Sequence, residues 1–187
     1  MVAMAEAKEH FAGTREDFVK QALLEYESPL LGYATTFLHD IERAKDVVQD
    51  TFIRLYQQDV EKVKDGLKAW LFTVCRNRAL DVIRKEKRMI GLEEEQVSRL
   101  PSERRTPAQR ADLTERVEQV HSALNRLSEN QREVILLKFE QGLSYEEISE
   151  ITGLSTGNVG FLLHTGLKRL RSFLPKDLLR DLTPQTV

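Results

Sequence analysis

Cysteine is almost absent from the sequence, which has a single residue of this type, Cys75, in 187 positions. One thiol excludes a disulfide within the chain and a zinc site built from cysteines. Long apolar runs are also absent, since no stretch approaches the ~18 apolar residues of a membrane-spanning helix. The first ten residues carry Glu6, Lys8 and Glu9 where a signal peptide needs an apolar core. We therefore expect a soluble, cytoplasmic protein in a reducing compartment, without membrane insertion.

Catalytic signatures are missing as well. The sequence has no P-loop, no HExxH, no GxSxG and no glycine-rich phosphate cradle after a strand. The four histidines are scattered, without the spacing of metal ligands: His10, His39, His121 and His164. These absences predict that the protein is not an enzyme and has no cofactor, no catalytic residue and no metal site.

A basic excess, the usual sign of a nucleic-acid partner, is not found in the chain as a whole, whose net charge is −2 and whose pI is about 6.1. The charge is distributed unevenly, however. Residues 66–90 hold seven lysines and arginines against two acids, whereas residues 40–65 hold seven acids against five lysines and arginines. The average therefore conceals a polarised chain, and a DNA-binding segment is compatible with it.

Apolar residues recur at helical spacing along most of the chain, and no convincing strand pattern is present, so we predict an all-α fold. Helices at 14–26, 30–38, 43–58 and 70–88 are expected to form a first domain, residues 14–90, with Ser28 and Pro29 separating the first two. Residues 91–112 contain Pro101 and Pro107 and lack periodicity, which is typical of a flexible linker. A second domain is expected at 113–174, followed by a tail at 175–187.

The second domain has the signals of a helix-turn-helix unit. Ser128 with Gln131, and Ser144 with Glu147, match the capping-box pattern, and Gly142 suits a left-handed turn between them. A short helix, a turn at Gly153 and a longer helix opened by Ser155 then follow. The expected core consists of Ile148, Ile151, Leu154, Val159, Leu163 and Leu170. Such units read DNA, but they also serve as protein-binding modules.

The helix predicted at 70–88 has two distinct faces when its residues are placed 100° apart. One face is apolar and is expected in the core: Phe72, Cys75, Ala79, Val82 and Ile83. The other combines an aromatic ring, an amide and cations: Trp70, Asn77, Asp81, Arg84 and Arg88. Unpaired bases stack on aromatic rings while cations follow the backbone, so this face suits single-stranded nucleic acid. The alternative is a solvated amphipathic helix with Trp70 packed in the core, since basic helix ends also follow from the helix dipole.

Three segments, in this order, carry a resemblance to a known family: AKDVVQDTFIRLY (44–56), AWLFTVCRNRALDVIRKEKR (69–88) and LSENQREVILLKFEQGLSYEEISEITGLSTGNV (127–159). They resemble regions 2 and 4 of bacterial sigma-70 factors, and the two-domain plan resembles the extracytoplasmic function (ECF) subgroup. The resemblance spans residues 14–174. It implies a four-helix region 2 domain, a helix-turn-helix region 4 domain, and a non-enzymatic subunit that directs RNA polymerase to promoters in transcription initiation.

The resemblance also implies roles for particular residues of region 2. The segment that docks on the clamp coiled coil of the polymerase β′ subunit corresponds to Asp46, Gln49, Asp50, Phe52 and Arg54. The loop at 64–69 and the following helix correspond to the part that captures a flipped base of the minus-ten element and opens the duplex. Its implied DNA-binding residues are Lys64, Lys68, Trp70, Arg76, Asn77, Arg78, Asp81, Arg84, Lys85, Lys87 and Arg88. The implied partners are core polymerase (β′ clamp and β flap), promoter DNA and an anti-sigma factor.

The last helix departs from the family pattern, because Gly160, Leu162 and Thr165 stand where relatives usually carry basic residues. The expected contacts with the minus-thirty-five element are Ser155, Thr156, Asn158, Phe161, His164, Lys168 and Arg171. An exposed Phe161 is open to three interpretations: contact with a thymine methyl, packing on a protein, or a tolerated surface residue. The alternative to a sigma factor is a regulator or interaction module with a sigma-like fold that does not deliver polymerase. The acidic DVVQD segment favours the sigma factor, since a free-standing regulator needs no polymerase-docking surface.

Overall fold

The computed structural model describes residues 14–90 and 111–175, which belong to two compact units, Met1–Glu95 and Gln96–Val187. All regular secondary structure in the described ranges is helical, which confirms the predicted all-α class. The predicted linker lies outside the described residues except for positions 111 and 112, and the tail lies outside them except for Pro175. The finer domain limits, 14–90 and 113–174, stay predictions.

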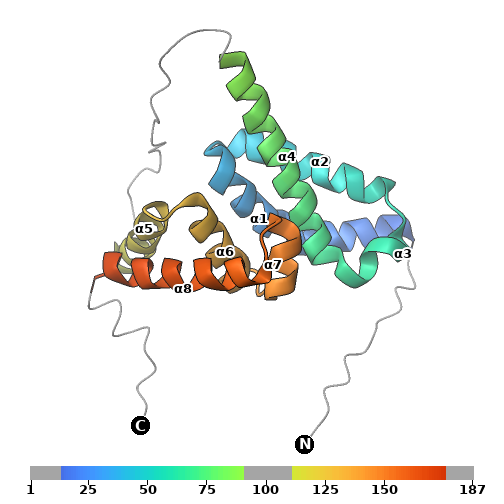
Figure 1. Cartoon of the computed structure of the whole chain (residues 1–187). Helices are drawn as coiled ribbons and strands as arrows, with labels where there is room; N and C mark the ends of the chain where they lie inside the picture. The colour runs from blue at the N-terminus through green and yellow to red at the C-terminus, as the bar shows by residue number, and fades with distance from the viewer. Residues whose placement is uncertain (1–13, 91–110, 176–187) are drawn as a thin grey trace, which may run out of the picture. The chain divides into compact units, whose positions relative to one another are not determined.

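The first unit is built from three long helices, α1 (Arg15–Leu38), α2 (Ile41–Gln57) and α4 (Leu67–Ile90) (Figure 1). The short α3 (Val60–Val63) and one 3-10 turn, η1 (Lys64–Gly66), connect α2 to α4. Thr14 begins α1 as predicted: its hydroxyl accepts from the Asp17 amide, and the Asp17 carboxylate accepts from the Thr14 amide. Asp40 caps α2 in a similar way. These caps bind amide groups that have no partner inside the helix.

The predicted break at Ser28 and Pro29 is wrong, because α1 continues through both residues to Leu38. A proline inside a helix removes one backbone hydrogen bond and costs about 3 kcal/mol or more. Residues on both sides of Pro29 are buried, among them Ala22 before it and Leu30 and Tyr33 after it. Burial of both halves of α1 in one core offsets the local cost. The proline alone gives no indication of this packing.

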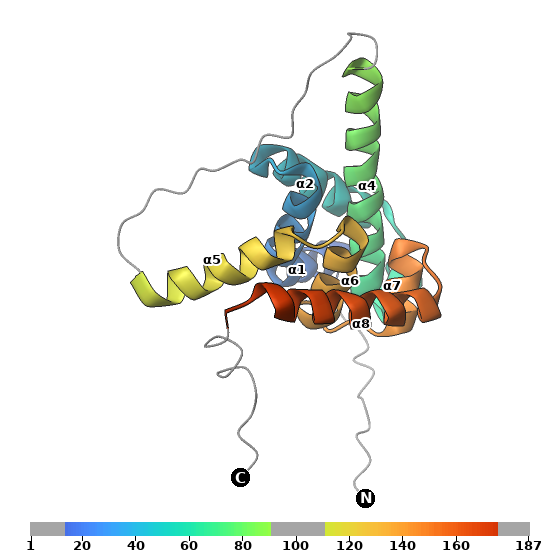
Figure 2. The ribbon, with the colours of Figure 1, turned by 60° about the vertical axis from the view of Figure 1, so that its left-hand side comes forward.

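The core of the first unit lies between α1, α2 and α4. The Tyr33 ring meets the rings of Phe37 and Phe72 edge-on, with centroids 5.1 Å apart in both pairs. Cys75 is also buried; its thiol donates to the Leu30 carbonyl, and burial raises the pKa of Cys75 to about 12. Phe72, Cys75 and Ala79 are core residues as predicted, whereas Val82 and Ile83 are only half-buried. The reason is that the last turns of α4 project past α1 and α2 (Figure 2).

The second unit contains α5 (Ala111–Asn125), α6 (Glu129–Phe139), α7 (Tyr145–Thr152) and α8 (Thr156–Phe173). The last two form the predicted helix-turn-helix. Ser144 and Glu147 make the reciprocal capping box at the start of α7, and Gly153 ends α7 with a φ of 73°. Ser155 caps α8 by accepting from the Asn158 amide at 3.3 Å. The helix-turn-helix prediction is therefore confirmed.

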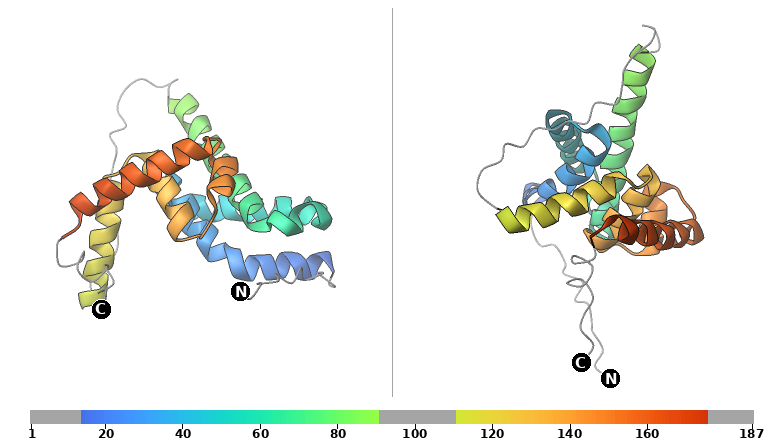
Figure 3. Two further views of the ribbon diagram at one scale, coloured as in Figure 1. Left: turned by 60° about the horizontal axis from the view of Figure 1, so that its bottom comes forward. Right: turned by 90° about the vertical axis from the view of Figure 1, so that its left-hand side faces the viewer.

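Packing in the second unit centres on α8, which contacts α7 near its N-terminal end, α6 beyond it, and α5 towards its C-terminal end (Figure 3). Ile148, Val159 and Leu163 are buried in this core, and Leu154 and Leu170 are half-buried. The predicted capping box of α6 is only half formed. Ser128 accepts from the Gln131 amide, but the Gln131 side chain donates to the Thr165 hydroxyl of α8 at 3.1 Å. A tertiary contact thus replaces the local one.

Candidate DNA and polymerase interfaces

The outer side of α4 carries the residues expected to meet single-stranded DNA. Asn77, Arg84 and Arg88 are exposed, and Trp70 and Asp81 are half-buried. Arg84 donates to the Asp81 carboxylate at 3.0 Å, and Arg88 donates to the Arg84 carbonyl at 3.3 Å. Trp70 is thus not fully buried, and it lies at the start of α4, next to η1.

The turn that precedes α4 holds one of the expected DNA-binding cations. Lys64, in η1, donates to the Glu61 carboxylate at 2.6 Å, and this hydrogen bond raises the pKa of Lys64. The lysine therefore keeps its positive charge throughout the physiological range. Lys68 is half-buried in the first turn of α4. Both cations precede Trp70 in the chain, and their role towards DNA stays a prediction.

The remaining cations of α4 point in different directions. Lys85 and Lys87 are exposed near its C-terminal end, and Arg76 is half-buried. Arg78 is turned towards α2, where its Nε and Nη2 atoms both approach Asp50 Oδ2 at 2.7 Å. Asp50 and Arg78 were assigned to two different partners, the polymerase and DNA. In this structure they bind each other, and their roles towards those partners stay predictions.

A second ion pair also joins α2 to α4. Arg43, near the start of α2, donates to the Glu86 carboxylate of α4. The two pairs, Arg43 with Glu86 and Asp50 with Arg78, lie along one side of α2. Two ion pairs therefore join α2, the helix expected to meet polymerase, to α4, the helix expected to meet DNA.

The solvent side of α2 holds most of the expected polymerase contacts. Asp46, Gln49 and Arg54 are exposed, and Asp50 is half-buried. Phe52 is different, because only 7% of it is exposed. Its ring belongs to the core and to the wall of the groove described next. A partner could therefore contact Phe52 only by entering that groove.

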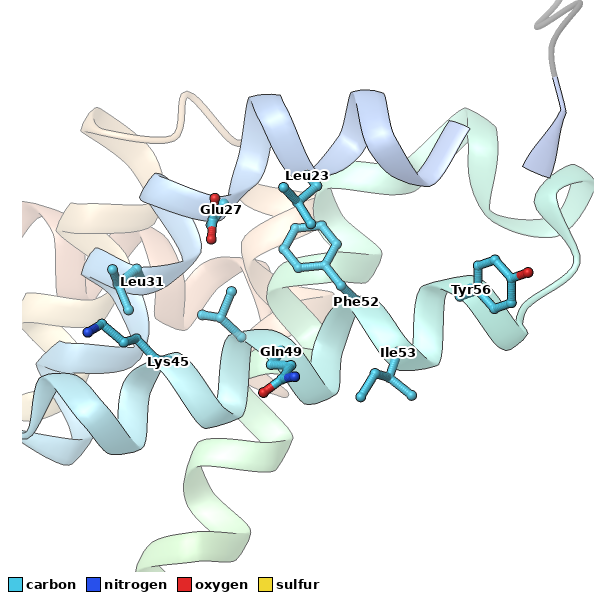
Figure 4. Close-up of a pocket in the computed structure, with 9 residues that line it drawn as sticks. Leu23, Glu27, Leu31, Lys45, Gln49, Phe52, Ile53 and Tyr56 are labelled. Atoms are coloured by element: carbon cyan, nitrogen blue, oxygen red, sulfur yellow. The ribbon is translucent and has the colours of Figure 1, made fainter. Parts of the chain in front are cut away.

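Sequence reasoning missed an apolar groove of about 470 Å³ between α1 and α2 (Figure 4). Its apolar walls are formed by Leu23 and Leu31 of α1 and by Val48, Phe52, Ile53 and Tyr56 of α2. Its polar rim consists of Glu27, Lys45 and Gln49. Leu23, Ile53 and Tyr56 are 37%, 49% and 48% exposed. The available signal was the apolar character of Ile53 and Tyr56 outside the buried stripe of α2.

In the second unit, the expected minus-thirty-five contacts lie on the outer side of α8. Phe161 is 63% exposed. The other expected contacts are also exposed: Ser155, Thr156, Asn158, His164, Lys168 and Arg171. Ser155 has a structural role as the N-cap. Glu146 and Glu150 of α7 are exposed as well, so the unit is not uniformly cationic.

Neither a metal-ligand cluster nor a membrane-spanning helix is present in the described ranges. No three or more His, Cys, Asp or Glu side chains gather there in a way that would hold a metal ion. Within 14–90 and 111–175, no helix combines the length and apolar character needed to cross a membrane.

Two family models match the chain, one in each unit. The model described as Sigma-70 region 2 matches residues 23–89, and the model described as Sigma-70, region 4, matches residues 117–170. The two matches coincide with the α1 to α4 unit and with the helix-turn-helix unit.

Several sigma factors are similar over most of their length. The ECF RNA polymerase sigma factor EcfG of Rhodopseudomonas palustris is 30% identical over 169 residues, covering 90% of this chain and 91% of the relative. The RNA polymerase sigma factor SigV of Bacillus subtilis is 26% identical, covering 88% and 95%. A solved structure of the sigma factor RpoE from Bartonella quintana, in complex with the anti-sigma factor NepR, superposes with a TM-score of 0.66 at 30% identity, covering 90% and 99%.

The predicted resemblance is therefore confirmed on three counts: the two region models in the expected order, the relatives matched along nearly their whole length, and the shared two-unit helical fold. The chain belongs to the sigma-70 family of RNA polymerase sigma factors, in the extracytoplasmic function (ECF) subgroup.

Proposed function

We propose that the chain acts in the cytoplasm as an initiation subunit that binds core RNA polymerase through α2 and its groove with α1, and opens promoter DNA with η1 and α4. The observation that supports this most is the direct contact between the two helices: Asp50 and Arg78, and Arg43 and Glu86, join α2 to α4. A helix held by polymerase on one side would then fix the position of the helix that holds DNA.

The α2 surface suits a helical protein partner with both apolar and cationic side chains. The exposed parts of Leu23, Ile53 and Tyr56 line a groove, and the carboxylate of Asp46 is exposed on the same helix. A buried apolar centre with a charged rim is the usual composition of a specific protein interface. We assign this surface to the clamp coiled coil of the β′ subunit. A regulator that acted without polymerase would have no use for it.

The α4 surface suits one separated DNA strand. Trp70 offers part of an aromatic face for an unstacked base, and the cations of η1 and α4 lie on either side of it. Stacking one base stabilises the open strand by roughly 1 to 3 kcal/mol. Unpairing it costs a few kcal/mol. The polymerase must therefore hold the rest of the bubble, and no bond is made or broken by the chain, so its part in initiation requires no catalytic residue.

The second unit supplies the upstream contacts in this proposal. We assign α8 to the major groove of the minus-thirty-five element and the unit as a whole to the β flap of polymerase. The similar Bartonella protein was solved with an anti-sigma factor. We therefore also propose that a protein of this class restrains the chain when its promoters are silent.

Charge reversal at Asp46 tests the docking surface. Asp50 is less suitable, since its replacement would also leave Arg78 without its partner. Asp46→Arg is expected to lower co-purification with core polymerase at least tenfold, because like charges across an interface cost several kcal/mol. It is also expected to abolish run-off transcription from promoters that the unmodified chain selects from a library.

The matched control is Glu25→Arg, the same charge reversal at an exposed residue of α1 that does not line the groove. This variant should be retained by polymerase like the unmodified chain, and circular dichroism should show equal helix content in both variants. Full retention of Asp46→Arg would refute the assignment of α2 to polymerase.

A further inference from the structure

We propose that Phe161 is a specificity residue of α8, whose ring contacts the C5-methyl group of one thymine in the upstream promoter element. The proposal rests on the proposed function, in which α8 enters the major groove. Of the three interpretations of Phe161 that the sequence leaves open, the proposal selects contact with a thymine methyl.

The fold does not use the Phe161 ring. The buried residues of α8, Val159, Leu163 and Gly166, face α6 and α7, whereas Phe161 is 63% exposed on the other side of the helix. Burying a Phe side chain is worth roughly 1.5 to 3 kcal/mol, and this gain is largely unrealised within the second unit. The ring is therefore accessible to a partner, as is the equally exposed ring of Phe139 in α6.

The neighbours of Phe161 on the helix surface favour a base edge over a protein. Positions three and four residues away share its face, and they carry Gly157, Asn158, His164 and Thr165. The core of a protein interface is a contiguous apolar patch. Here one aromatic ring stands among small and polar residues. The thymine methyl is a single apolar group among hydrogen-bonding groups in the major groove, and Phe is one of the side chains that contact it.

The position of Phe161 along α8 is also suitable. In helix-turn-helix proteins, residues near the N-terminus of the second helix reach the base edges. Phe161 lies in the second turn of α8, one turn after Asn158, while Lys168 and Arg171 lie further along. The ring is therefore placed for bases, and the cations are placed for the flanking phosphates.

The charges of the unit increase the importance of such a contact. Glu146 and Glu150 are exposed on α7, the helix that precedes the turn. Acidic groups there reduce the attraction to phosphates, which is the part of the binding free energy that does not depend on sequence. A larger share of the binding free energy must then come from base contacts, so the loss of one apolar contact should be measurable.

Deoxyuridine substitution tests the contact directly, because it removes only the methyl group. Promoters are first selected from a randomised library by run-off transcription with core polymerase and the full chain. Each thymine of the upstream element is then replaced by deoxyuridine, one at a time, and holoenzyme binding is measured. One position should weaken binding about fourfold, given ~0.8 kcal/mol per buried methyl-sized group and 1.4 kcal/mol per tenfold change.

With Phe161→Ala, binding to the thymine promoter should fall by a similar factor, and deoxyuridine at that position should cause no further loss. The salt dependence of binding should not change, because no phosphate contact is removed. The matched control is Phe139→Ala, at the end of α6, whose side chain is also 63% exposed. That variant should keep the full methyl dependence.

Two results would overturn the proposal: a methyl dependence that persists in Phe161→Ala, or weaker promoter binding by Phe161→Ala when no thymine methyl matters. The second result would place the ring against a protein surface of the polymerase or of a regulator. If the holoenzyme selects no promoter from the library, the proposed function itself fails, and this result differs from both of the others.

Discussion

Three glycines lie in α8, and their surroundings give them different roles. A Cβ atom at Gly157 would meet nothing within 4 Å. A Cβ atom at Gly166 would lie 3.0 Å from Ile135 Cδ1 and 3.3 Å from Gln131 Cβ, both on α6. The Ile135 methyl group can rotate away, but Gln131 Cβ is fixed to the α6 backbone. Gly166 is thus required for the close approach of α6 and α8, whereas the fold does not require Gly157.

This difference predicts opposite effects of the same substitution. Gly157→Ala should stabilise the second unit by up to ~1 kcal/mol, the helix-propensity difference between the two residues. Gly166→Ala gains the same propensity but overpacks the α6 contact, which typically costs about 1 to 3 kcal/mol, so a net loss is expected. Urea unfolding followed by circular dichroism measures both. Equal stabilisation by the two substitutions would show that α6 and α8 can separate without cost.

The sequence is informative about single residues wherever the cause is local. Thr14, Ser144 and Gly153 were assigned correctly, because a cap or a left-handed turn depends on the chain within a few residues. Pro29 was misread because the cause lies elsewhere: its helix is maintained by packing on α2 and α4. The partner of Asp50, 28 positions away in Arg78, could not be found from local patterns at all.

At the scale of whole elements, α2 contacts a different helix along each of its two edges. One edge faces α4 through Asp50 and Arg43, and the other edge faces α1 across the groove that Ile53 and Tyr56 line. The buried stripe between these edges could be predicted from helical periodicity. The groove could not, because its depth depends on how closely α1 approaches α2.

The ion pair between Asp50 and Arg78 is expected to contribute modestly to the packing of α2 on α4. Its side chains are 40% and 31% exposed, and pairs of this kind are typically worth about 0.2 to 1 kcal/mol. A double-mutant cycle with Asp50→Asn and Arg78→Gln, measured by urea unfolding, should give a coupling energy in this range. The coupling should shrink at high salt.

Lys87→Gln serves as the matched control for that cycle, since Lys87 is an exposed cation of α4 that lies nine residues beyond Arg78. Its combination with Asp50→Asn should be additive within about 0.5 kcal/mol if the two side chains share no partner. A coupling of several kcal/mol between Asp50 and Arg78 would mean that the pair fixes the position of α4, rather than merely accompanying the burial of Phe72 and Leu71.

At the scale of the whole molecule, the surfaces that we assign to partners are divided between two units. The first unit carries the α2 surface and the α4 surface, and the second carries α8. Motif order in the sequence was sufficient to predict this division, since each motif lies within one unit. The residue assignments within each site stay predictions, because they depend on partners rather than on the chain.

Promoter opening provides the test at this scale, because it requires polymerase, both units and DNA together. Trp70→Ala combined with Asn77→Ala removes the half-buried ring and the exposed amide of α4 but leaves the core residues Phe72 and Cys75 in place. The holoenzyme should still bind the promoter, yet permanganate reactivity of thymines near the start site should fall about fivefold or more, since losing a stacked base costs roughly 1 to 3 kcal/mol and 1.4 kcal/mol is tenfold. Phe161→Ala, assayed at saturating holoenzyme, should bind less tightly but open the duplex normally, because its contact lies upstream. If the Trp70 and Asn77 variant opens the promoter as well as the unmodified chain, the outer face of α4 is a solvated surface, and strand capture must be assigned to η1 alone.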